Sequence, residues 1–132
     1  MTIEIEVTAA IMRRGGKIFA AKRASGRHLA GFWEFPGGKV EQGETKQQCL
    51  SRELNEEFGI VVSVGDFFGE SIFDYGEKKI RLCAYETEHI SGEFELTDHD
   101  EICWVEHSKL SELRWAPADM PFVKRLEGKL SK

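Results

Sequence analysis

The segment from Gly38 to Ile60, GKVEQGETKQQCLSRELNEEFGI, constrains the fold more than any other part of this chain. Thr45, with Gln48 three residues later, has the spacing of a capping box, and Gly59 suits the left-handed residue that ends a helix. The segment therefore predicts an α-helix over residues 46–58.

The two faces of this predicted helix differ in chemistry. Apolar residues recur at every fourth position and predict a buried stripe: Leu50, Leu54 and Phe58, with Cys49 beside them. The rest of the surface carries Arg52, Glu53, Glu56 and Glu57. Because residues at i, i+3 and i+4 share one helix face, we expect the three glutamates to converge and to repel one another unless a cation or proton lies among them. Oxygen-only ligands favour Mg²⁺, with Mn²⁺ as a substitute.

A glutamate-rich helix face is by itself more often solvated surface than a metal site. The neighbouring residues change that balance, because the whole segment follows the pattern G-x5-E-x7-R-E-U-x-E-E-x-G-U, where U is aliphatic. If each specified residue type occurs at about 6 per cent, a chance match is on the order of 10⁻⁹ per starting position. The segment resembles the Nudix box of the Nudix hydrolases without a departure.

Two further residues of the box have expected roles. Arg52 precedes Glu56 by four residues, so it can pair with that carboxylate and hold its rotamer, a role that we favour over substrate contact. Gly37 and Gly38 allow a close backbone approach, and a carbonyl of Gly38 could complete the metal shell.

Length and composition fit one domain over residues 1–132. With 132 residues and 41% apolar content, the chain can form one core but not two ordinary domains. The net charge of -5 argues against direct nucleic-acid binding. Three widely spaced cysteines favour free thiols in a reducing compartment, and neither an apolar run of about 18 residues nor a basic leader is present. We expect a cytoplasmic, membrane-independent protein, either a monomer or a homodimer.

The remaining patterns predict an α+β fold. Apolar and β-branched segments separated by turn signals predict strands over residues 3–12, 17–21, 61–73, 79–86 and 102–105. A short helix is expected over residues 108–113, and a last helix is expected after Ala116-Pro117-Ala118, with an apolar face of Phe122, Val123, Leu126 and Leu130. Strands around two helices imply layers. The resemblance implies the same arrangement, a Nudix-type α/β/α sandwich with a mixed β-sheet between helices.

The segment Lys22–Lys39, KRASGRHLAGFWEFPGGK, resembles the lead-in of the MutT-like branch of the family. This resemblance implies that Arg23 lies near the nucleobase, that Glu34 and Phe35 line the sugar and base pocket, and that Lys39 lies beside the phosphates. On composition alone, Trp33 and Phe35 are core residues more often than stacking platforms. His28 is expected at the edge of the substrate pocket and not as a metal ligand.

A second tract, Leu113–Val123, resembles the CTP pyrophosphohydrolase subgroup through its A-P-A-D-x-P sequence. The resemblance places a base-reading residue at Asp119, where the best-known 8-oxo-dGTP-cleaning relatives have an amide. An ionised Asp119 only accepts hydrogen bonds, for example from N4 of cytosine or from N1-H and N2-H of a guanine. The alternative is an ordinary helix N-cap.

A third acidic group, Asp98, Asp100 and Glu101, is expected in a loop. Related enzymes carry a Glu-His pair there, in which the Glu binds metal or activates water. Asp98-His99 matches this pair with a shorter acid, so Asp98 is a candidate metal ligand and base. A solvated acidic loop is an equal alternative.

Together these residues predict a Mg²⁺-dependent nucleoside triphosphate pyrophosphohydrolase that releases a nucleoside monophosphate and pyrophosphate. Glu53 is the first candidate for the general base and Asp98 is its rival, while Lys39 and Lys78 would stabilise the leaving group. Expected substrates are CTP or dCTP, their modified forms, or oxidised nucleotides such as 8-oxo-dGTP, a nucleotide-cleaning role that supports DNA replication and repair. The alternatives are a non-catalytic nucleotide-binding or regulatory Nudix module, and a hydrolase of another nucleoside diphosphate derivative.

Overall fold

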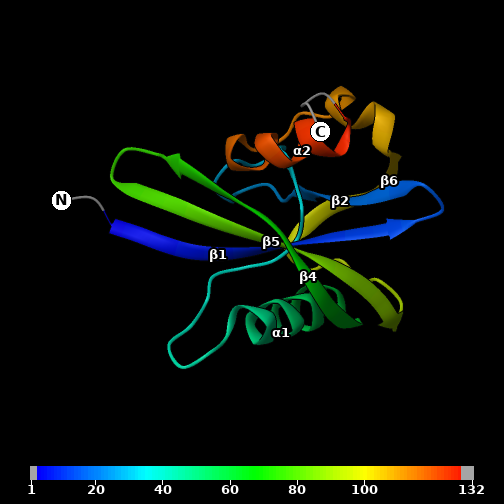
Figure 1. Cartoon of the computed structure of the whole chain (residues 1–132), viewed down its shortest axis with the longest axis horizontal. Coiled ribbons are helices and arrows are strands. Elements are labelled where there is room, and N and C mark those ends of the chain that lie inside the picture. Colours follow the sequence, from blue (N-terminus) through cyan, green and yellow to red (C-terminus); the bar gives the residue numbers. More distant parts are fainter. Residues whose placement is uncertain (1–2, 129–132) are drawn as a thin grey trace.

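The chain forms one mixed sheet with helices on both sides (Figure 1). The structure, a computed structural model, describes residues 3–128. Its elements in chain order are β1 (Ile3–Arg14), β2 (Lys17–Arg23), β3 (Trp33–Glu34), α1 (Lys46–Phe58), β4 (Val61–Asp74), β5 (Lys78–Ser91), β6 (His99–Glu106), the 3-10 helices η1 (His107–Glu112) and η2 (Pro117–Asp119), and α2 (Met120–Leu126). Within the described range, no helix has the length and apolar character needed to cross a membrane.

Strand β1 joins the two halves of the sheet. The strand order is β3-β2-β1-β5-β4, and β6 pairs with β2. β1 runs parallel to β5, from Ile3 opposite Lys78 to Met12 opposite Thr87. Beside the turn at its end, β1 pairs with β2 in the antiparallel direction. The sheet is therefore mixed, as predicted.

Both faces of β1 are buried from Thr8 to Met12, and this part of the strand divides the core into two clusters. Ala9 and Ile11 pack in the cluster below α2, whereas Ala10 and Met12 pack in the cluster above α1. Successive side chains of a strand point to opposite faces, so one strand supplies both clusters. Helix α1 covers one face of the sheet, and η1, η2 and α2 cover the other (Figure 1). This confirms the predicted α+β sandwich.

Helix α1 has the predicted bounds and caps. The Thr45 hydroxyl accepts a hydrogen bond from the backbone N–H of Gln48 at 3.0 Å, and the Gln48 side chain accepts one from the N–H of Thr45 at 2.9 Å. Gly59 ends the helix with φ 72°, a left-handed conformation. The apolar stripe is buried as expected: Cys49, Leu50, Leu54 and Phe58.

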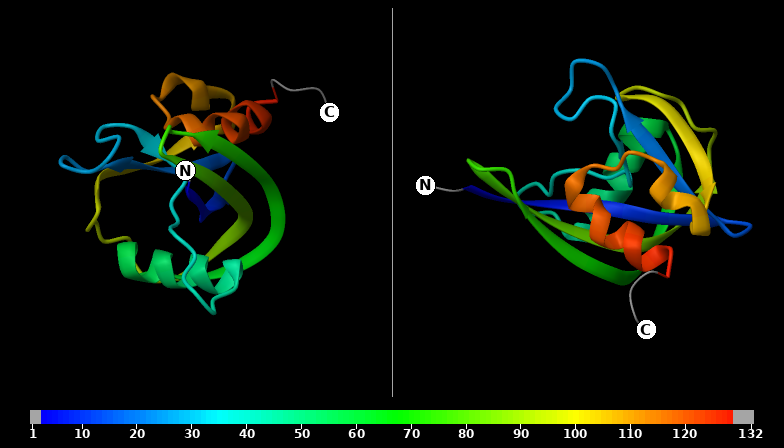
Figure 2. Two further views of the ribbon diagram at one scale, coloured as in Figure 1. Left: turned by 90° about the vertical axis from the view of Figure 1, so that its left-hand side faces the viewer. Right: turned by 90° about the horizontal axis from the view of Figure 1, so that it is seen from above.

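Strands β4 and β5 extend beyond the predicted segments and curve around α1 (Figure 2). The register between them shifts at several points, including Val64/Phe67 and Phe67/Gly69. Such bulges bend a strand and increase its twist. Because of this curvature, strands β4 and β5 extend from the layer of η2 and α2 to the layer of α1.

Several predicted elements differ in detail. Asp100 and Glu101, expected in a loop, lie in β6, because that strand pairs with β2 as far as His99 opposite Arg23. The short helix after β6 is a 3-10 helix, and α2 ends at Leu126. Leu130, expected on the last helix, lies outside the described residues. The two-residue strand β3 was not predicted.

Candidate functional site

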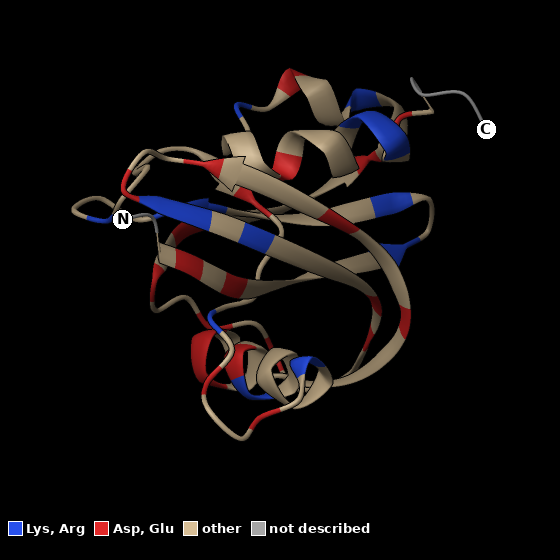
Figure 3. Cartoon of the chain, turned by 60° about the vertical axis from the view of Figure 1, so that its left-hand side comes forward, with Lys and Arg blue, Asp and Glu red and all other residues tan. Residues whose placement is uncertain are grey.

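Two cavities share Arg23 and Glu34 as lining residues. The first, which we call the carboxylate cavity, has a volume of about 390 Å³. Its charged lining residues are the acids Glu34, Glu53, Glu57 and Asp98 and the bases Arg23, Arg27 and Lys39. The second, which we call the Asp119 cavity, has a volume of about 210 Å³. Charges of both signs therefore line the carboxylate cavity. Its acidic residues include those at the end of α1 that is red in Figure 3.

Helix α1 sends two of its three glutamates into the carboxylate cavity. Glu53 and Glu57 are among the lining residues, whereas Glu56 is not. The Glu56 side chain is 59% exposed and pairs with Arg52 at 3.1 Å. At about 100° per residue, positions 56 and 57 lie on opposite flanks of position 53, so the sheet covers one flank and solvent the other. The expected convergence therefore holds for Glu53 and Glu57 but not for Glu56.

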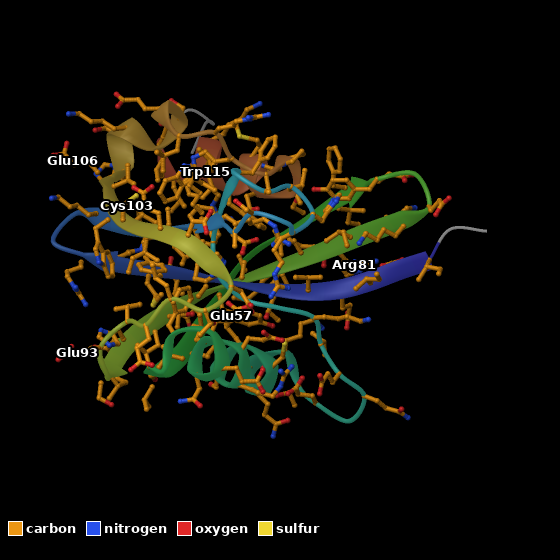
Figure 4. The ribbon with its side chains drawn as sticks, turned by 180° about the vertical axis from the view of Figure 1, so that it is seen from behind. Glu57, Arg81, Glu93, Cys103, Glu106 and Trp115 are labelled. Atoms are coloured by element: carbon orange, nitrogen blue, oxygen red, sulfur yellow. The ribbon has the colours of Figure 1, made fainter. Side chains whose placement is uncertain are left out.

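Glu57 lies among other carboxylates of the cavity and is largely removed from water. Burial, followed by the nearby carboxylates of Glu34, Glu53 and Asp98, raises the pKa of Glu57 to about 9. Burial also raises the pKa of Glu53. One carboxyl oxygen of Glu57 is buried without a hydrogen-bond partner. Figure 4 shows Glu57 where α1 faces the sheet.

These features fit a hard divalent cation. Crowded carboxylates that retain a proton, together with a buried oxygen that lacks a donor, are satisfied when a cation replaces the proton. Within residues 3–128, no three acidic, histidine or cysteine side chains form a group that could hold a metal ion as the side chains stand. Glu56 is paired with Arg52, and Asp98 is paired with Arg27. Glu53 is also paired with Arg52. The candidate ligands that line the cavity are Glu53, Glu57 and Asp98.

The Gly37-Gly38 loop fits closely between β1 and α1. A Cβ atom on Gly37 would lie 2.0 Å from the backbone oxygen of Thr8, and one on Gly38 would lie 2.1 Å from the carboxyl carbon of Glu53. The Gly38 carbonyl, a candidate metal ligand, accepts hydrogen bonds from the Thr8 N–H at 2.8 Å and the Thr8 hydroxyl at 3.2 Å. That carbonyl is therefore already used to attach the loop to β1.

Arg52 ties the same loop to α1. Its guanidinium donates to both carboxylate oxygens of Glu44, at 2.6 and 3.1 Å, and to the Lys39 carbonyl at 3.3 Å. It also reaches Glu53 at 3.1 Å. The hydrogen bond from Arg52 lowers the pKa of Glu44 to about 2. The expected pairing with Glu56 exists, and the bidentate contact with Glu44 is an additional one that the i, i+4 rule does not predict.

Glu34 stands between the two cavities and uses both carboxylate oxygens. One accepts a hydrogen bond from Arg23 at 2.8 Å, and the other lies 2.7 Å from Nε2 of His99. The His99 ring is buried and stacks on Phe58, the last residue of α1, with ring centroids 5.2 Å apart. His99 therefore holds a carboxylate that the resemblance assigned to the substrate pocket.

The Asp119 cavity brings together residues from distant parts of the chain. His28, Tyr75, Lys78 and Asp119 line it. Asp119 is 4% exposed, and its carboxyl group accepts from the Phe35 N–H at 3.4 Å. Burial raises the pKa of Asp119 well above its ordinary value, and the negative charge of Glu34 acts in the same direction. The Asp119 side chain makes no capping hydrogen bond to α2, so the plain N-cap interpretation lacks its contact.

The aromatic pair Trp33 and Phe35 divides between core and site. Both are buried, and the Phe35 ring packs on Trp115 with centroids 4.5 Å apart. Phe35 also lines the carboxylate cavity, while Trp33 belongs to the core cluster alone. The core interpretation is therefore correct for Trp33, and Phe35 serves both purposes.

Sequence reasoning assigned no role to Arg27 or to the His99 ring. Arg27 lies in an irregular loop without periodicity, so nothing local predicts its direction. His99 precedes the apolar residues of β6, and its adjacency to Asp98 was the available signal. Their placement depends on the pairing of β6 with β2.

Comparison with known proteins agrees with this geometry. A family model described as the NUDIX domain matches residues 3–126. The CTP pyrophosphohydrolase of Escherichia coli (strain K12) is 38% identical over 119 residues, covering 90% of this chain and 88% of that protein. A putative 8-oxo-dGTP diphosphatase 2 of Mycobacterium tuberculosis (strain ATCC 25618 / H37Rv) is 40% identical over 126 residues, covering 93% of this chain and 87% of that protein.

A solved structure is also similar. The crystal structure of a MutT protein from Methanosarcina mazei Go1 has a TM-score of 0.87 at 27% sequence identity and covers 99% of this chain and 98% of its own. The fold and the box define a hydrolase of the Nudix type. The chain belongs to the Nudix family, whose hydrolases generally use divalent metal ions.

Proposed function

We propose that this protein is a Mg²⁺-dependent nucleoside triphosphate pyrophosphohydrolase that releases a nucleoside monophosphate and pyrophosphate. One observation carries the proposal: Glu53 and Glu57 enter a cavity opposite Arg23, Arg27 and Lys39, and this cavity adjoins a second one lined by Asp119. The first cavity has the charges that bind a polyphosphate and its cation. The second cavity is more apolar, which suits a nucleobase.

The residues of the carboxylate cavity divide the chemical work. Bound Mg²⁺ would be held by Glu53 and Glu57, with Asp98 and Glu56 as further candidates, and would supply charge neutralisation and a water of lowered pKa. The need for neutralisation is large, because two unit charges 4 Å apart interact by roughly 4 kcal/mol at an effective dielectric of 20. Lys39 is exposed at the cavity and would stabilise charge on the departing pyrophosphate, with Lys78 as a second candidate.

Glu53 remains our first candidate for the general base, and Asp98 is the rival. Glu53 lies in the cavity, and burial raises its pKa, so its carboxylate accepts a proton more readily than an exposed one does. Asp98 lines the same cavity. Each of the two carboxylates pairs with an arginine, Asp98 with Arg27 and Glu53 with Arg52, so the ion pairs do not separate the two candidates. Arg52, which contacts Glu53, Glu44 and the Lys39 carbonyl, holds these groups in place.

Asp119 is our candidate for reading the base. Its raised pKa favours the protonated form, which offers one donor and one acceptor, as an amide does. This alters the expectation of an acceptor-only group and suits both cytosine and an oxidised purine. The two bacterial relatives are named for these two kinds of base, one as a CTP pyrophosphohydrolase and the other as a putative 8-oxo-dGTP diphosphatase.

The cellular role follows from the chemistry. Removing modified nucleotides before a polymerase uses them places the protein in nucleotide-pool sanitation, beside DNA replication and repair. The thiols of Cys49, Cys83 and Cys103 are free, which supports a reducing, cytoplasmic setting. We expect no direct nucleic-acid partner and either a monomer or a homodimer.

The test is pyrophosphate release from a panel of CTP, dCTP, 5-methyl-dCTP, 8-oxo-dGTP, dGTP and ADP-ribose, with Mg²⁺ and with chelator. We expect cytosine nucleotides or 8-oxo-dGTP to lead, and all turnover to stop with chelator. Absence of hydrolysis across the panel would contradict the proposal and favour a non-catalytic Nudix module. ADP-ribose as the best substrate would favour a hydrolase of nucleoside diphosphate derivatives.

The carboxylate assignment has its own test. We expect Glu53→Gln to reduce kcat at least about 100-fold, because the amide removes both a cation ligand and the candidate base. Glu88→Gln, an exposed glutamate of β5, is the matched control and should retain full activity. Unfolding curves of both variants should coincide with that of the wild type, and near-normal turnover by Glu53→Gln would exclude this role.

A further inference from the structure

Arg27 lines the carboxylate cavity and pairs with an acidic residue of the same cavity. Its guanidinium pairs with the carboxylate of Asp98, and the two side chains are 53% and 41% exposed. Both residues belong to the cavity lining. The pair therefore joins the loop between β2 and β3 to the residue before β6.

The loop that carries Arg27 is anchored independently of this pair. The N–H of Ala24 donates to the Asp98 carbonyl at 3.3 Å, and the N–H of Arg27 donates to the Ala24 carbonyl at 3.2 Å. The N–H of Gly31 closes the base of the loop on the Arg23 carbonyl at 3.0 Å. These hydrogen bonds fix the backbone position of Arg27. The long side chain of Arg27 can therefore change its partner without a movement of the loop.

The cations of the cavity differ in how firmly they are engaged. Arg23 is 28% exposed and contacts both Glu34 and the His28 carbonyl, the latter at 2.6 Å. Arg27 has an exposed pairing with Asp98, and exposed ion pairs contribute little because water and salt screen them. A guanidinium binds a phosphate group with two parallel hydrogen bonds, and a polyphosphate brings more negative charge than one carboxylate. Arg27 is therefore the arginine of the cavity best placed to be drawn to an incoming substrate.

We propose that Arg27 exchanges partners during the reaction cycle, pairing with Asp98 in the free protein and with the polyphosphate chain of the substrate in the complex, and that this exchange releases Asp98 to the cavity. The inference rests on the proposed function and deepens it. It assigns Arg27 as a substrate-binding residue and explains why Asp98 does not face the cavity as a free carboxylate before substrate arrives.

The exchange predicts opposite effects on two ligands. Replacing Arg27 removes a phosphate contact, so substrate binding weakens. The same replacement removes the counter-charge of Asp98 in the free protein, so divalent cations bind more tightly before any nucleotide is added. If Arg27 only supported the loop, its replacement would not tighten the binding of the cation or of the substrate.

The experiment compares Arg27→Gln with the wild type and with Arg13→Gln. Arg13 is the matched control, because it pairs with Glu86 at 2.7 Å on another part of the sheet, with side chains 48% and 36% exposed. Binding of inorganic pyrophosphate and of the α,β-methylene analogue of CTP is measured by calorimetry in chelator. Binding of Mn²⁺ to the nucleotide-free protein is measured by electron paramagnetic resonance of the free ion.

We expect Arg27→Gln to weaken the binding of the CTP analogue about 5- to 20-fold and to tighten Mn²⁺ binding at least about threefold. Arg27→Lys should keep part of the analogue binding, and Arg13→Gln should change neither quantity. Analogue binding within twofold of the wild type, or weaker Mn²⁺ binding, would overturn the exchange. Neither measurement needs turnover. If the protein hydrolysed nothing on the panel, the proposed function would be contradicted, and the two binding measurements would still test the exchange.

Discussion

His99 is the residue whose importance is least visible in the sequence. Its Nε2 forms a hydrogen bond with Glu34, which borders both cavities, and its ring stacks on Phe58 at the end of α1. A buried imidazole that bonds a carboxylate through Nε2 fixes both its own orientation and that of its partner. We regard His99 as a positioning residue for Glu34.

This role gives a prediction at the scale of one residue. His99→Phe keeps the stacked ring but removes the hydrogen bond, so we expect KM to rise about tenfold, since a hydrogen bond to a charged group contributes roughly 1.5–3 kcal/mol. The value of kcat should change less than about threefold. His99→Gln restores a donor and should recover much of the loss. Steady-state kinetics decide this, and equal KM values for the Phe and Gln variants would refute the positioning role.

At the scale of elements, the contact between the Gly37-Gly38 loop, β1 and α1 aligns the site. Thr8 on β1 binds the Gly38 carbonyl twice, and Arg52 on α1 binds the Lys39 carbonyl. The loop is thereby fastened to the strand on one side and to the helix on the other. A Cβ atom at Gly37 would meet the backbone of β1, and one at Gly38 would meet the carboxylate of Glu53.

The two glycines should respond differently to the same substitution. In Gly38→Ala the new methyl group meets the end of the flexible Glu53 side chain, so we expect activity to fall at least about 100-fold while the free energy of unfolding changes by less than about 1 kcal/mol. In Gly37→Ala the methyl group meets the backbone of β1, so we expect a loss of about 2 kcal/mol in stability. Urea unfolding and initial rates measured on both variants test this. The same stability loss in both would contradict the distinction.

At the scale of the whole molecule, Asp119 joins the C-terminal layer to the sheet. It is the last residue of η2 and directly precedes α2, yet its carboxyl group accepts a hydrogen bond from the N–H of Phe35, just beyond β3. Because the folded protein raises the pKa of this buried group, folding binds a proton that the unfolded chain releases above pH of about 4. The contribution of protonated Asp119 to the free energy of unfolding is therefore complete below that pH. It is lost as the pH rises through the pKa of Asp119 in the folded protein.

Asp119→Asn should therefore change how stability depends on pH. Between the unfolded and folded pKa values, the wild type loses about 1.4 kcal/mol per pH unit from this group, and the variant does not. We expect the variant to gain stability relative to the wild type as the pH rises from 4 to 8, and the ranking of nucleotide substrates to change while pyrophosphate release persists. Denaturant unfolding at a series of pH values and the substrate panel measure both. A difference in stability that stays constant with pH would show that Asp119 is ionised in the folded protein.

The local pattern of the chain determined the box helix completely. Thr45, Gln48 and Gly59 placed both ends of α1, and the four-residue apolar spacing selected its buried face, because capping and periodicity depend on residues within a few positions of one another. The apolar segments likewise predicted most strands and the α+β class. Family resemblance indicated Asp119 and Glu34 as lining residues, and the cavities contain them.

Only the tertiary structure decided which of these groups meet. Glu56 and Glu57 are neighbours in sequence, but the sheet lies over one side of α1, so one carboxyl oxygen of Glu57 is buried and Glu56 remains exposed with Arg52. Arg27 and Asp98 are brought together by the pairing of β6 with β2, and His99 of β6 reaches Glu34 of β3 because both strands pair with β2. Contacts between residues far apart in the chain depend on strand order and register, and neither is encoded in any local spacing.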